Sequence, residues 1–481
     1  MKKVNCDVLV IGGGPAGGVC AVTAKMNYPE KEILVVREFE VQLVPCAIPY
    51  IFGATLGCSE KNVASCGMAE EMGISTLLGK IEDINVEKKI AYSNENEITF
   101  DKLVFATGSQ PFVHTSLQDS LGLEGVFTVP KNKMLIDKAK AYIDNVDNIV
   151  VVGTGFIGIE MAMEFAESGK NVTVIGGSKH ILKGPFDPEV AIQAEEIILK
   201  HGITFIGNDR VTAVIDKNGD NIVNGVQLKS GKVVDTQVVV LATGYKPNST
   251  LAQKVGMKIE HYGGINVNEY MRTENPDIFA VGDCSARRSF ISNAPSKVML
   301  ASTSAAEGRI AGSSLYGFKY IKGFNGTIAI FSTMVGDMAF ASAGITESEA
   351  VAANGDIVVG TFTSTNRHPS TIPGAQKQFV KLIAMRHSGQ IIGGQVIGGN
   401  EAGEMINIIG VMIEANLNIY QVMSMQVATQ PMLTAAPTNY PIIMAATMIA
   451  HKIDNHFFLF FLFLSQMKSI TRVPKMPLSE D

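Results

Sequence analysis

The chain has 481 residues, more than one hydrophobic core usually spans, so we expect several domains. Its composition, 46% hydrophobic and 18% charged, is that of an ordinary globular protein, and a net charge of −6 without a basic stripe argues against a nucleic-acid surface. Six scattered cysteines without a Cys-x-x-Cys pair exclude a disulfide framework and indicate a reducing cytoplasm. No group of His, Cys, Asp and Glu has metal-ligand spacing, so no metal site is predicted.

The chain opens with an apolar stretch that runs into a glycine turn. Residues 7–17, DVLVIGGGPAG, predict a strand, then Gly12, Gly14 and Gly17, then a helix; Asp7 interrupts the apolar run, which argues against a signal peptide. The first glycine permits the tight turn, the second lets backbone approach a pyrophosphate, and the third allows close helix–strand packing. The N-terminus of the helix carries partial positive charge toward the phosphates. The segment therefore predicts a dinucleotide-binding turn.

A cysteine follows between two prolines in residues 43–50, LVPCAIPY. Most lone cysteines are small buried hydrophobes. This window alone leaves open whether Cys46 takes part in chemistry.

The glycine turn is repeated in residues 148–160, NIVVVGTGFIGIE, through Gly153, Gly155 and Gly158. Each turn is followed at nearly the same distance by the same strand ending, VFATGSQP at 104–111 and VLATGYKP at 240–247. Repetition on this scale predicts two homologous dinucleotide-binding modules and an α/β fold.

Two further patterns complete the chain order. Residues 277–284, DIFAVGDC, predict a strand that ends in Gly282-Asp283. From about residue 326, short strands around an HSGQ turn precede an amphipathic helix over residues 404–417. No segment reaches the roughly 20 apolar residues needed to span a bilayer; the nearest is FFLFFLFL at 457–464.

In this order the motifs resemble those of the pyridine nucleotide–disulfide oxidoreductase superfamily, over about residues 4–453. The resemblance implies FAD and either NADH or NADPH as cofactors, and two Rossmann-like domains followed by an α+β dimerisation domain. It also implies a homodimer in which the last domain completes the partner's active site. The expected bounds are 1–113 and 245–325 for the FAD-binding domain, 114–244 for the NAD(P)H-binding domain, 326–453 for the dimerisation domain and 454–481 for a C-terminal extension.

By the same resemblance, the first glycine turn and Asp283 contact FAD, and the second glycine turn contacts the nicotinamide dinucleotide. In the FAD strand, Arg37 stands where an acidic residue is common, and Glu38 is expected to take that role. The full set of predicted cofactor-binding residues is Gly12, Gly14, Pro15, Ala16, Gly17, Arg37, Glu38, Ala106, Thr107, Gly108, Gly153, Gly155, Phe156, Ile157, Gly158, Glu160, Gly176, Gly244, Gly282, Asp283 and Ala301.

Cys46 resembles the redox cysteine of the single-cysteine branch: coenzyme A–disulfide reductases, NADH oxidases, NADH peroxidases and NAD(P)H sulfur reductases. In that branch the cysteine cycles as a thiolate, mixed disulfide or sulfenic acid beside the flavin. We expect the site to lower the pKa of Cys46, through a helix that begins just after it or through a nearby cation. The branch also implies a tyrosine from the partner's C-terminal domain near the sulfur. Tyr440 matches it by position, with an interface tyrosine as the alternative.

Several departures bear on the branch. The first turn, GGGPAGG, lacks the histidine of peroxidases and water-forming oxidases, so the chain looks closer to the coenzyme A–disulfide and sulfur reductases. Few basic residues other than Lys25 lie near the first helix, which weakens the coenzyme A reading, and Gln430 replaces a histidine. Gly176-Gly177 stand where NADH-preferring members have an acid, so the choice between NADH and NADPH stays open.

We therefore predict a cytoplasmic, FAD-dependent NAD(P)H oxidoreductase that reduces a small disulfide, persulfide or polysulfide through Cys46. One alternative is an NADH oxidase that passes electrons to O2. A second is a redox-sensing flavoprotein with negligible turnover. The apolar run 457–464 is expected to be covered, because an exposed run of this kind invites aggregation.

Overall fold

The computed structural model describes residues 1–65, 67–318 and 323–454, so the apolar run 457–464 lies outside the described residues. The chain forms two compact units. Of the described residues, the first consists of those within 1–184, 188–329 and 334–336, and the second of 185–187, 330–333 and 337–454.

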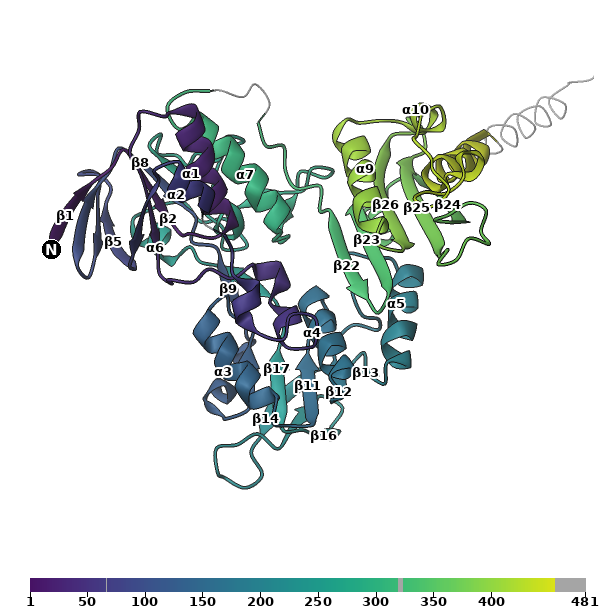
Figure 1. Ribbon diagram of the computed structural model, residues 1–481, viewed down its shortest axis with the longest axis horizontal. Helices are drawn as coiled ribbons and strands as arrows, with labels where there is room; N and C mark the ends of the chain where they lie inside the picture. The colour runs from purple at the N-terminus through teal and green to yellow at the C-terminus, as the bar shows by residue number, and fades with distance from the viewer. Residues whose placement is uncertain (66, 319–322, 455–481) are drawn as a thin grey trace, which may run out of the picture. The chain divides into compact units, whose positions relative to one another are not determined.

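The first unit contains two five-stranded parallel sheets that share one arrangement (Figure 1). In each sheet, the strand that leads into the glycine turn lies between the next strand of the chain and the strand with the Ala-Thr-Gly ending. The strand orders are β19-β8-β2-β3-β4 and β10-β17-β11-β12-β13. The bounds are β2 (Val8–Ile11), β3 (Ile33–Arg37), β4 (Ser75–Leu78), β8 (Lys102–Phe105) and β19 (Ile278–Ala280) in the first, and β10 (Val126–Thr128), β11 (Asn148–Val152), β12 (Asn171–Ile175), β13 (Thr204–Ile206) and β17 (Val238–Leu241) in the second. The predicted repeat is thus confirmed as two Rossmann-like sheets.

Helices cover these sheets. The central strands are continuous runs of Val, Ile and Leu because both of their faces are buried, and apolar clusters lie on each side of the first sheet. Helices α1 (Pro15–Asn27) and α7 (Ala301–Ser314) pack against each other, and a Cβ at Gly308 would lie only 2.7 Å from the Ala16 carbonyl oxygen. The remaining helices of this unit are α2 (Gly67–Glu71), α3 (Lys133–Ile143), α4 (Phe156–Glu167), α5 (Pro188–Lys200) and α6 (Thr250–Lys254).

Smaller sheets join the two modules and extend them. Strands β9 (Ser109–Pro111) and β18 (Tyr245–Pro247) pair where the chain crosses between the modules. The others are β1 (Lys2–Asn5), β5 (Ile81–Asn85), β6 (Ile90–Ser93) and β7 (Asn96–Thr99) in one sheet, β14 (Val211–Ile215), β15 (Gly225–Leu228) and β16 (Val233–Asp235) in another, and β20 (Arg287–Arg288) with β21 (Pro295–Ser296).

The second unit is built on one five-stranded sheet with the order β22-β23-β26-β25-β24. The HSGQ turn joins β25 to β26, and the predicted amphipathic helix is α9, so both expectations are confirmed. The bounds are β22 (Phe331–Val335), β23 (Met338–Gly344), β24 (Ile357–Thr365), β25 (Lys377–Met385), β26 (Ile391–Gly398), α8 (Glu347–Ala352), α9 (Ala402–Glu414) and α10 (Ile419–Met423), followed by a helix over residues 441–454.

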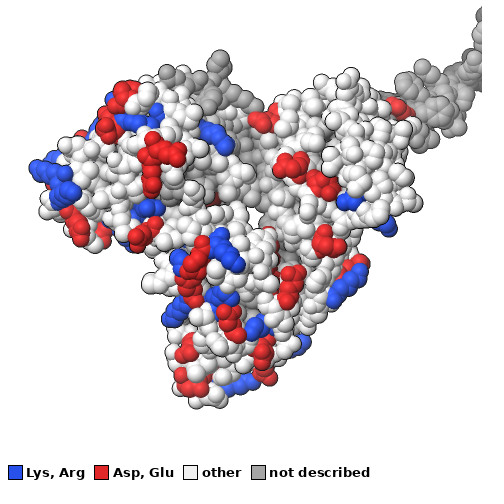
Figure 2. Space-filling model, viewed as in Figure 1, with Lys and Arg blue, Asp and Glu red and all other residues white. Residues whose placement is uncertain are grey.

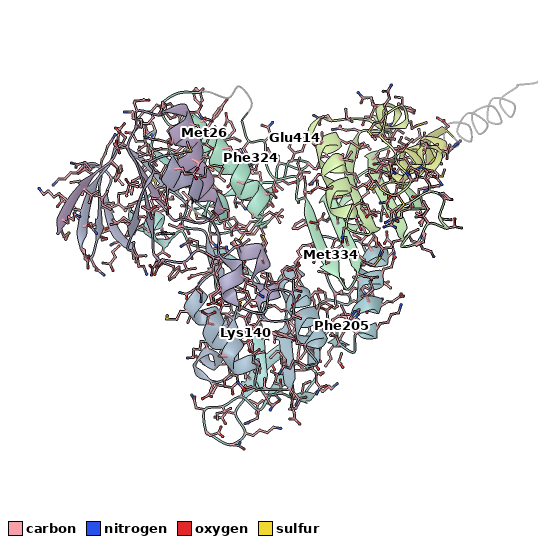
Figure 3. All side chains as sticks on the ribbon, in the orientation of Figure 1. Met26, Lys140, Phe205, Phe324, Met334 and Glu414 are labelled. Atoms are coloured by element: carbon pink, nitrogen blue, oxygen red, sulfur yellow. The ribbon has the colours of Figure 1, made fainter. Side chains whose placement is uncertain are left out.

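Charged side chains of both signs are interspersed on the face of the molecule drawn in Figure 2. Figure 3 shows the side chains of each unit, among them Phe205 on β13 and Lys140 on α3. Lys140 is an example of local pairing on a helix surface, since its ammonium lies 2.8 Å from the Asp144 carboxylate one turn later.

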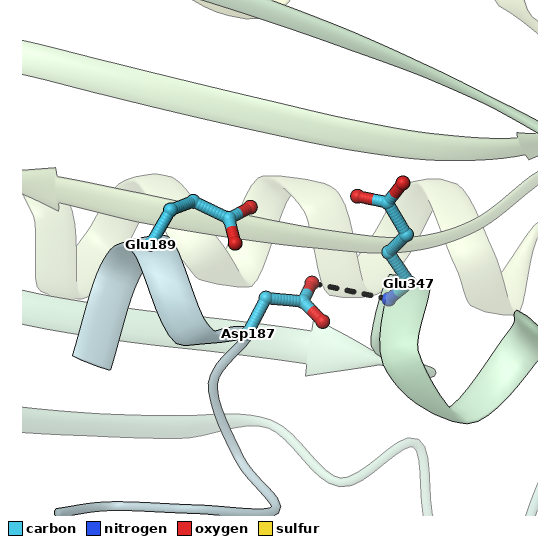
Figure 4. Close-up of side chains that lie close together, drawn as sticks. All are labelled: Asp187, Glu189 and Glu347. Carbon is cyan, nitrogen blue, oxygen red and sulfur yellow. Dashed lines mark hydrogen bonds between the residues drawn. The ribbon is translucent and has the colours of Figure 1, made fainter. Parts of the chain in front are cut away.

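A buried lysine pairs with two carboxylates in the second unit. The Asp187 carboxylate accepts a hydrogen bond from the Glu347 backbone N–H (Figure 4), and the Lys381 ammonium lies 2.9 Å from Asp187 and 2.6 Å from Glu347. Burial would raise the pKa of Asp187, but Lys381 and the Ser348 hydroxyl hold it below its usual value. The charge of Lys381 therefore offsets the charges of both carboxylates.

Candidate functional site

The two glycine turns have the same close contacts. Gly12 has a φ of +118°, and a Cβ there would lie 2.1 Å from the Ala106 carbonyl oxygen. Gly153 has a φ of +129°, and its Cβ would lie 2.2 Å from the Ala242 carbonyl oxygen. The Ala-Thr-Gly ending recurs because its alanine carbonyl presses against the first glycine of each turn. Only glycine fits there, since both the φ and the space exclude a side chain.

The middle glycines have the opposite surroundings. Gly14 and Gly155 precede α1 and α4 in extended conformations, and a Cβ at either would meet no protein atom within 4 Å. Glycine is therefore not required there by the fold. Open backbone at the N-terminus of a helix is what a bound pyrophosphate needs, so both turns fit a dinucleotide.

The predicted strand-end residues border the first turn differently. Arg37 lies along it, since a Cβ at Gly13 would be 3.2 Å from the Arg37 Cβ. Glu38 is exposed and lies 3.7 Å from the Lys80 ammonium. Gly176, at the end of β12, borders the second turn, because its Cβ would lie 2.4 Å from the Thr154 Cγ2.

The Gly282-Asp283 turn is clamped beside the start of α1. A Cβ at Gly282 would lie 2.7 Å from the Ala16 Cβ, and the Gly282 N–H donates to the Glu307 carboxylate at 2.7 Å. Arg287 pairs with Glu307 at 3.1 Å and donates to the Gly282 carbonyl at 2.6 Å. Burial raises the pKa of Glu307 despite the Arg287 charge. This buried pair holds Asp283 in place.

The Asp283 carboxylate accepts hydrogen bonds from the Ser109 hydroxyl at 2.7 Å and the Lys131 ammonium at 2.9 Å. Burial would raise the pKa of Asp283, but Lys131 and Ser109 hold it below its usual value. Lys131 also donates to Ser109 at 2.9 Å and lies 5.4 Å from the Tyr245 ring centroid. The site thus contains a largely buried carboxylate with two cations near it, Lys131 at 2.9 Å and Arg287 at 3.8 Å.

Cys46 lies in a 3-10 turn, Pro45–Ala47, and a second such turn spans Pro49–Ile51. The sequence predicted a helix that begins just after Cys46, but the structure has only these single turns. A proline nitrogen has no hydrogen to donate, and Pro49 begins the second turn. The residue Cys46 is exposed.

The expectation of a lowered Cys46 pKa is wrong for this chain. Partial burial raises the pKa of the Cys46 thiol, and the Glu160 and Asp283 charges raise it further. The Lys131 charge lowers it, so the expected cation is present but does not outweigh the other effects.

The Cys46 segment is docked on α4. A Cβ at Gly53 would lie 2.1 Å from the Glu164 carboxylate, which accepts a hydrogen bond from the Thr55 hydroxyl at 2.5 Å. Phe52 makes an edge-to-face contact with Phe165, with 5.9 Å between ring centroids. Burial raises the pKa of Glu164. One helix therefore carries the second glycine turn at its start and the anchor of the cysteine segment one turn beyond Glu160.

A pocket of about 160 Å³ opens at the start of α4. It brings together four of the predicted cofactor-binding residues, of which Gly244 belongs to the Ala-Thr-Gly ending of the second module. Its lining consists of Pro111, Val129, Gly155, Phe156, Ile157, Leu241, Ala242, Gly244 and Tyr245. An apolar pocket beside an open helix N-terminus fits the nicotinamide end of a dinucleotide.

The remaining predicted residues are placed as follows. Thr107 donates its hydroxyl to the Asn248 carbonyl, Gly108 has a φ of +67°, and Ala301 is the first residue of α7. Tyr440 belongs to the second unit, where 7% of it is exposed and burial raises its pKa.

Sequence reasoning missed Lys131, Ser109 and Glu164. Lys131 lies in the polar stretch TVPKNK, which has no periodicity to single it out. Ser109 directly follows the first Ala-Thr-Gly, and its repeat partner Tyr245 lies against the same lysine, so the repeat itself was a usable signal. Glu164 could have been noticed as an acid on the apolar face of α4.

Two parallel dinucleotide-type sheets, each with an open glycine turn, and an exposed cysteine on a segment docked on α4 are the arrangement of a two-nucleotide redox enzyme. The family model for the pyridine nucleotide-disulphide oxidoreductases matches residues 6–308, and the model for the dimerisation domain of the same family matches residues 330–440. The chain belongs to the pyridine nucleotide-disulphide oxidoreductase family. It is an oxidoreductase with FAD and NAD(P)H as cofactors.

Individual relatives agree with this assignment. The chain is 32% identical to the NAD(P)H coenzyme A polysulfide/persulfide reductase of Pyrococcus horikoshii, over 83% of this chain and 88% of that protein. It is 27% identical to an NADH oxidase of Methanocaldococcus jannaschii, over 93% of this chain and 99% of that protein. A solved NAD-dependent persulfide reductase from A. fulgidus superposes with a TM-score of 0.86 at 29% identity, covering 94% of this chain and 84% of that one.

Among the described residues, no helix is both long enough and apolar enough to cross a membrane.

Proposed function

We propose that this protein uses NAD(P)H to reduce a small disulfide, persulfide or polysulfide, with Cys46 as the residue that binds the substrate sulfur. The observation that carries the proposal is the docking of the cysteine segment on α4 through Gly53, Thr55 and Glu164. This contact fixes an exposed thiol within electrostatic reach of Lys131 and Asp283, which border the turn proposed for FAD. The Pyrococcus horikoshii relative, named for polysulfide and persulfide reduction, supports the choice of substrate.

The residues divide into two proposed cofactor sites. The first turn with Arg37, Glu38, Ala106, Thr107, Gly108, Asp283 and Ala301 would hold FAD, and the second turn with Glu160, Gly176 and Gly244 would hold the pyridine nucleotide. The observations that support this are the open Gly14 and Gly155 and the pocket beside Gly155. Bound FAD supplies the transfer of an electron pair from the nicotinamide to sulfur.

The chemistry of the chain's own residues follows from the thiol. The Cys46 thiolate attacks one sulfur of the substrate R–S–S–R′, forms a Cys46–S–S–R mixed disulfide and releases R′–S⁻, which takes up a proton. Two electrons from NAD(P)H and one proton then return Cys46 to its thiolate and release R–SH. The balance is NAD(P)H + H⁺ + RSSR′ → NAD(P)⁺ + RSH + R′SH. The Lys131 ammonium favours the thiolate, because its positive charge lowers the pKa of Cys46.

The test is Cys46→Ser in the FAD-loaded enzyme under anaerobic conditions, with Cys58→Ser as the matched control because Cys58 is less exposed. We expect Cys46→Ser to keep FAD, to be reduced by NAD(P)H, and to produce no thiol from coenzyme A disulfide or polysulfide. Cys58→Ser should retain turnover. Full thiol production by Cys46→Ser would refute the proposal.

Reduction of O2 is the second candidate, since relatives named NADH oxidase cover nearly all of this chain. Oxygen consumption faster than the reduction of any sulfur compound would favour it.

We further propose a homodimer in the cytoplasm, with Tyr440 of one subunit brought near Cys46 of the other. The match to the dimerisation domain and the free state of all five described cysteines support these statements. The domain bounds predicted from the sequence are part of the same proposal.

A further inference from the structure

The loop after β12 lies where a dinucleotide-binding module distinguishes its two nucleotides. In such modules an acid after the second strand binds the ribose 2′-hydroxyl of NADH, and an arginine nearby accommodates the 2′-phosphate of NADPH. Here the sequence after β12 is Gly176-Gly177-Ser178-Lys179, with no acid. Gly176 touches the second glycine turn at Thr154, so this loop borders the proposed nucleotide site directly.

Arg210 lies over this loop, although it is more than thirty positions away in the sequence. A Cβ at Gly177 would be 2.7 Å from the Arg210 Nε and 3.2 Å from its Cγ, so the side chain lies across the glycine surface. The absence of a side chain at Gly177 is what allows this approach. In the chain, Arg210 comes shortly after β13, the strand on which Phe205 is labelled in Figure 3.

Backbone hydrogen bonds fix the loop that carries Arg210. The Asn208 N–H donates to the Ser178 carbonyl at 3.0 Å, and the Asp209 N–H donates to the Gly176 carbonyl at 3.3 Å. A Cβ at Gly207 would lie 2.8 Å from the Lys179 carbonyl oxygen. The two loops are therefore closely packed, and the position of Arg210 relative to β12 is set by backbone.

The guanidinium is available for a ligand. Arg210 is exposed, and no hydrogen bond or ion pair of its side chain is present among the described residues. The preceding residue, Asp209, accepts hydrogen bonds from the Arg210 and Ser230 backbone N–H groups at 2.9 and 3.3 Å and makes no ion pair with the guanidinium among the described residues. Exposed Lys179 adds a second cation to the same loop.

We infer that Arg210 is the residue that selects NADPH over NADH, by binding the 2′-phosphate against the Gly176-Gly177 surface. A planar guanidinium suits a phosphate because two parallel N–H donors can meet two of its oxygens. This inference rests on the proposed pyridine-nucleotide site beside Gly155 and adds the identity of the nucleotide.

The test measures binding to the FAD-loaded enzyme by calorimetry, with adenosine 2′,5′-bisphosphate and adenosine 5′-monophosphate as probes. We expect the bisphosphate to bind about 10- to 100-fold tighter, as one charge-assisted phosphate contact provides. Arg210→Ala should remove most of that difference and leave the binding of the monophosphate unchanged. In turnover it should lower kcat/KM for NADPH by a similar factor and leave that for NADH unchanged.

Lys229→Ala is the matched control, because Lys229 is exposed, its backbone N–H bonds to the Arg210 carbonyl, and its loss changes the net charge equally. It should leave the ratio of the two affinities unchanged. Equal binding of both probes by the unaltered protein, or an unchanged ratio in Arg210→Ala, would overturn the inference. Neither result would affect thiol production through Cys46, so failure here is distinguishable from failure of the proposed function.

Discussion

Lys131 forms an ion pair with Asp283, and its charge lowers the pKa of the Cys46 thiol. The substitution Lys131→Met removes this charge with little change in side-chain length. The variant loses hydrogen bonds of 2.9 Å to Asp283 and to Ser109. Removing one partner of a buried ion pair costs about 3–5 kcal/mol, and the value should be lower here because 32% of the Lys131 side chain is exposed. We therefore expect a loss of about 2–3 kcal/mol in the free energy of unfolding.

The sign of the pH dependence follows from Asp283. Its pKa is lowered in the folded chain, so its ionised form contributes stability that is present above the ordinary carboxyl pKa of 3.8 and is lost as the pH falls through the folded pKa. The difference in unfolding free energy between the original chain and Lys131→Met should be largest at neutral pH and should decrease below pH 3.8. Urea unfolding at several pH values measures it.

The same variant changes the reactivity of Cys46. Without the lysine charge, the remaining effects on the Cys46 thiol all raise its pKa, so alkylation by iodoacetamide should require a higher pH than in the original chain. Alkylation of the Cys46→Ser variant measures how much of the signal comes from the other cysteines.

Lys133→Met is the matched control for Lys131→Met. Its ammonium pairs with Glu60 and Asp137 at 2.6 and 2.7 Å, and both partners are well exposed, so the substitution should change the free energy of unfolding little. The alkylation profile of Lys133→Met should match that of the original chain. Identical alkylation profiles for Lys131→Met and the original chain would refute the role given to Lys131.

Two further predictions concern the fold. Gly14→Ala should change the unfolding free energy by no more than about 1 kcal/mol yet weaken FAD binding roughly tenfold or more, whereas Gly12→Ala should cost about 3 kcal/mol or more, because its φ and the Ala106 carbonyl exclude a side chain. Unfolding curves with and without FAD separate the two effects, and an unaltered FAD affinity in Gly14→Ala would contradict the proposed site. Lys381→Met should destabilise the second unit by about 3–5 kcal/mol because it leaves Asp187 buried without its cation, while exposed Lys377→Met should have little effect. Equal urea midpoints for these two lysine variants would show that the buried pair contributes little.

The sequence predicted the parts of the fold that repeat or alternate. Continuous Val and Ile runs before the glycine turns predicted the central strands of both sheets, and the Ala-Thr-Gly endings predicted the strands beside them. The contact of Ala106 with Gly12 and of Ala242 with Gly153 explains physically why the two motifs occur together. Local backbone requirements leave a direct trace in sequence.

Contacts between distant residues left no such trace. Arg210 lies on Gly177 because two loops share backbone hydrogen bonds, and Glu164 meets Gly53 because the cysteine segment docks on α4. The pKa of Cys46 was predicted with the wrong sign for a related reason. It depends on partial burial and on three charges from separate elements, and although Glu160 and Asp283 lie in recognised motifs, their proximity to Cys46 is set by the fold.

The most direct test of the central claim is the anaerobic stoichiometry of the FAD-loaded protein. A known amount of NADPH is added with excess coenzyme A disulfide, and free thiol is counted. The account predicts two thiols per NADPH oxidised, with none formed by Cys46→Ser. Oxidation of NADPH without thiol formation, or equal thiol formation by Cys46→Ser, would contradict it.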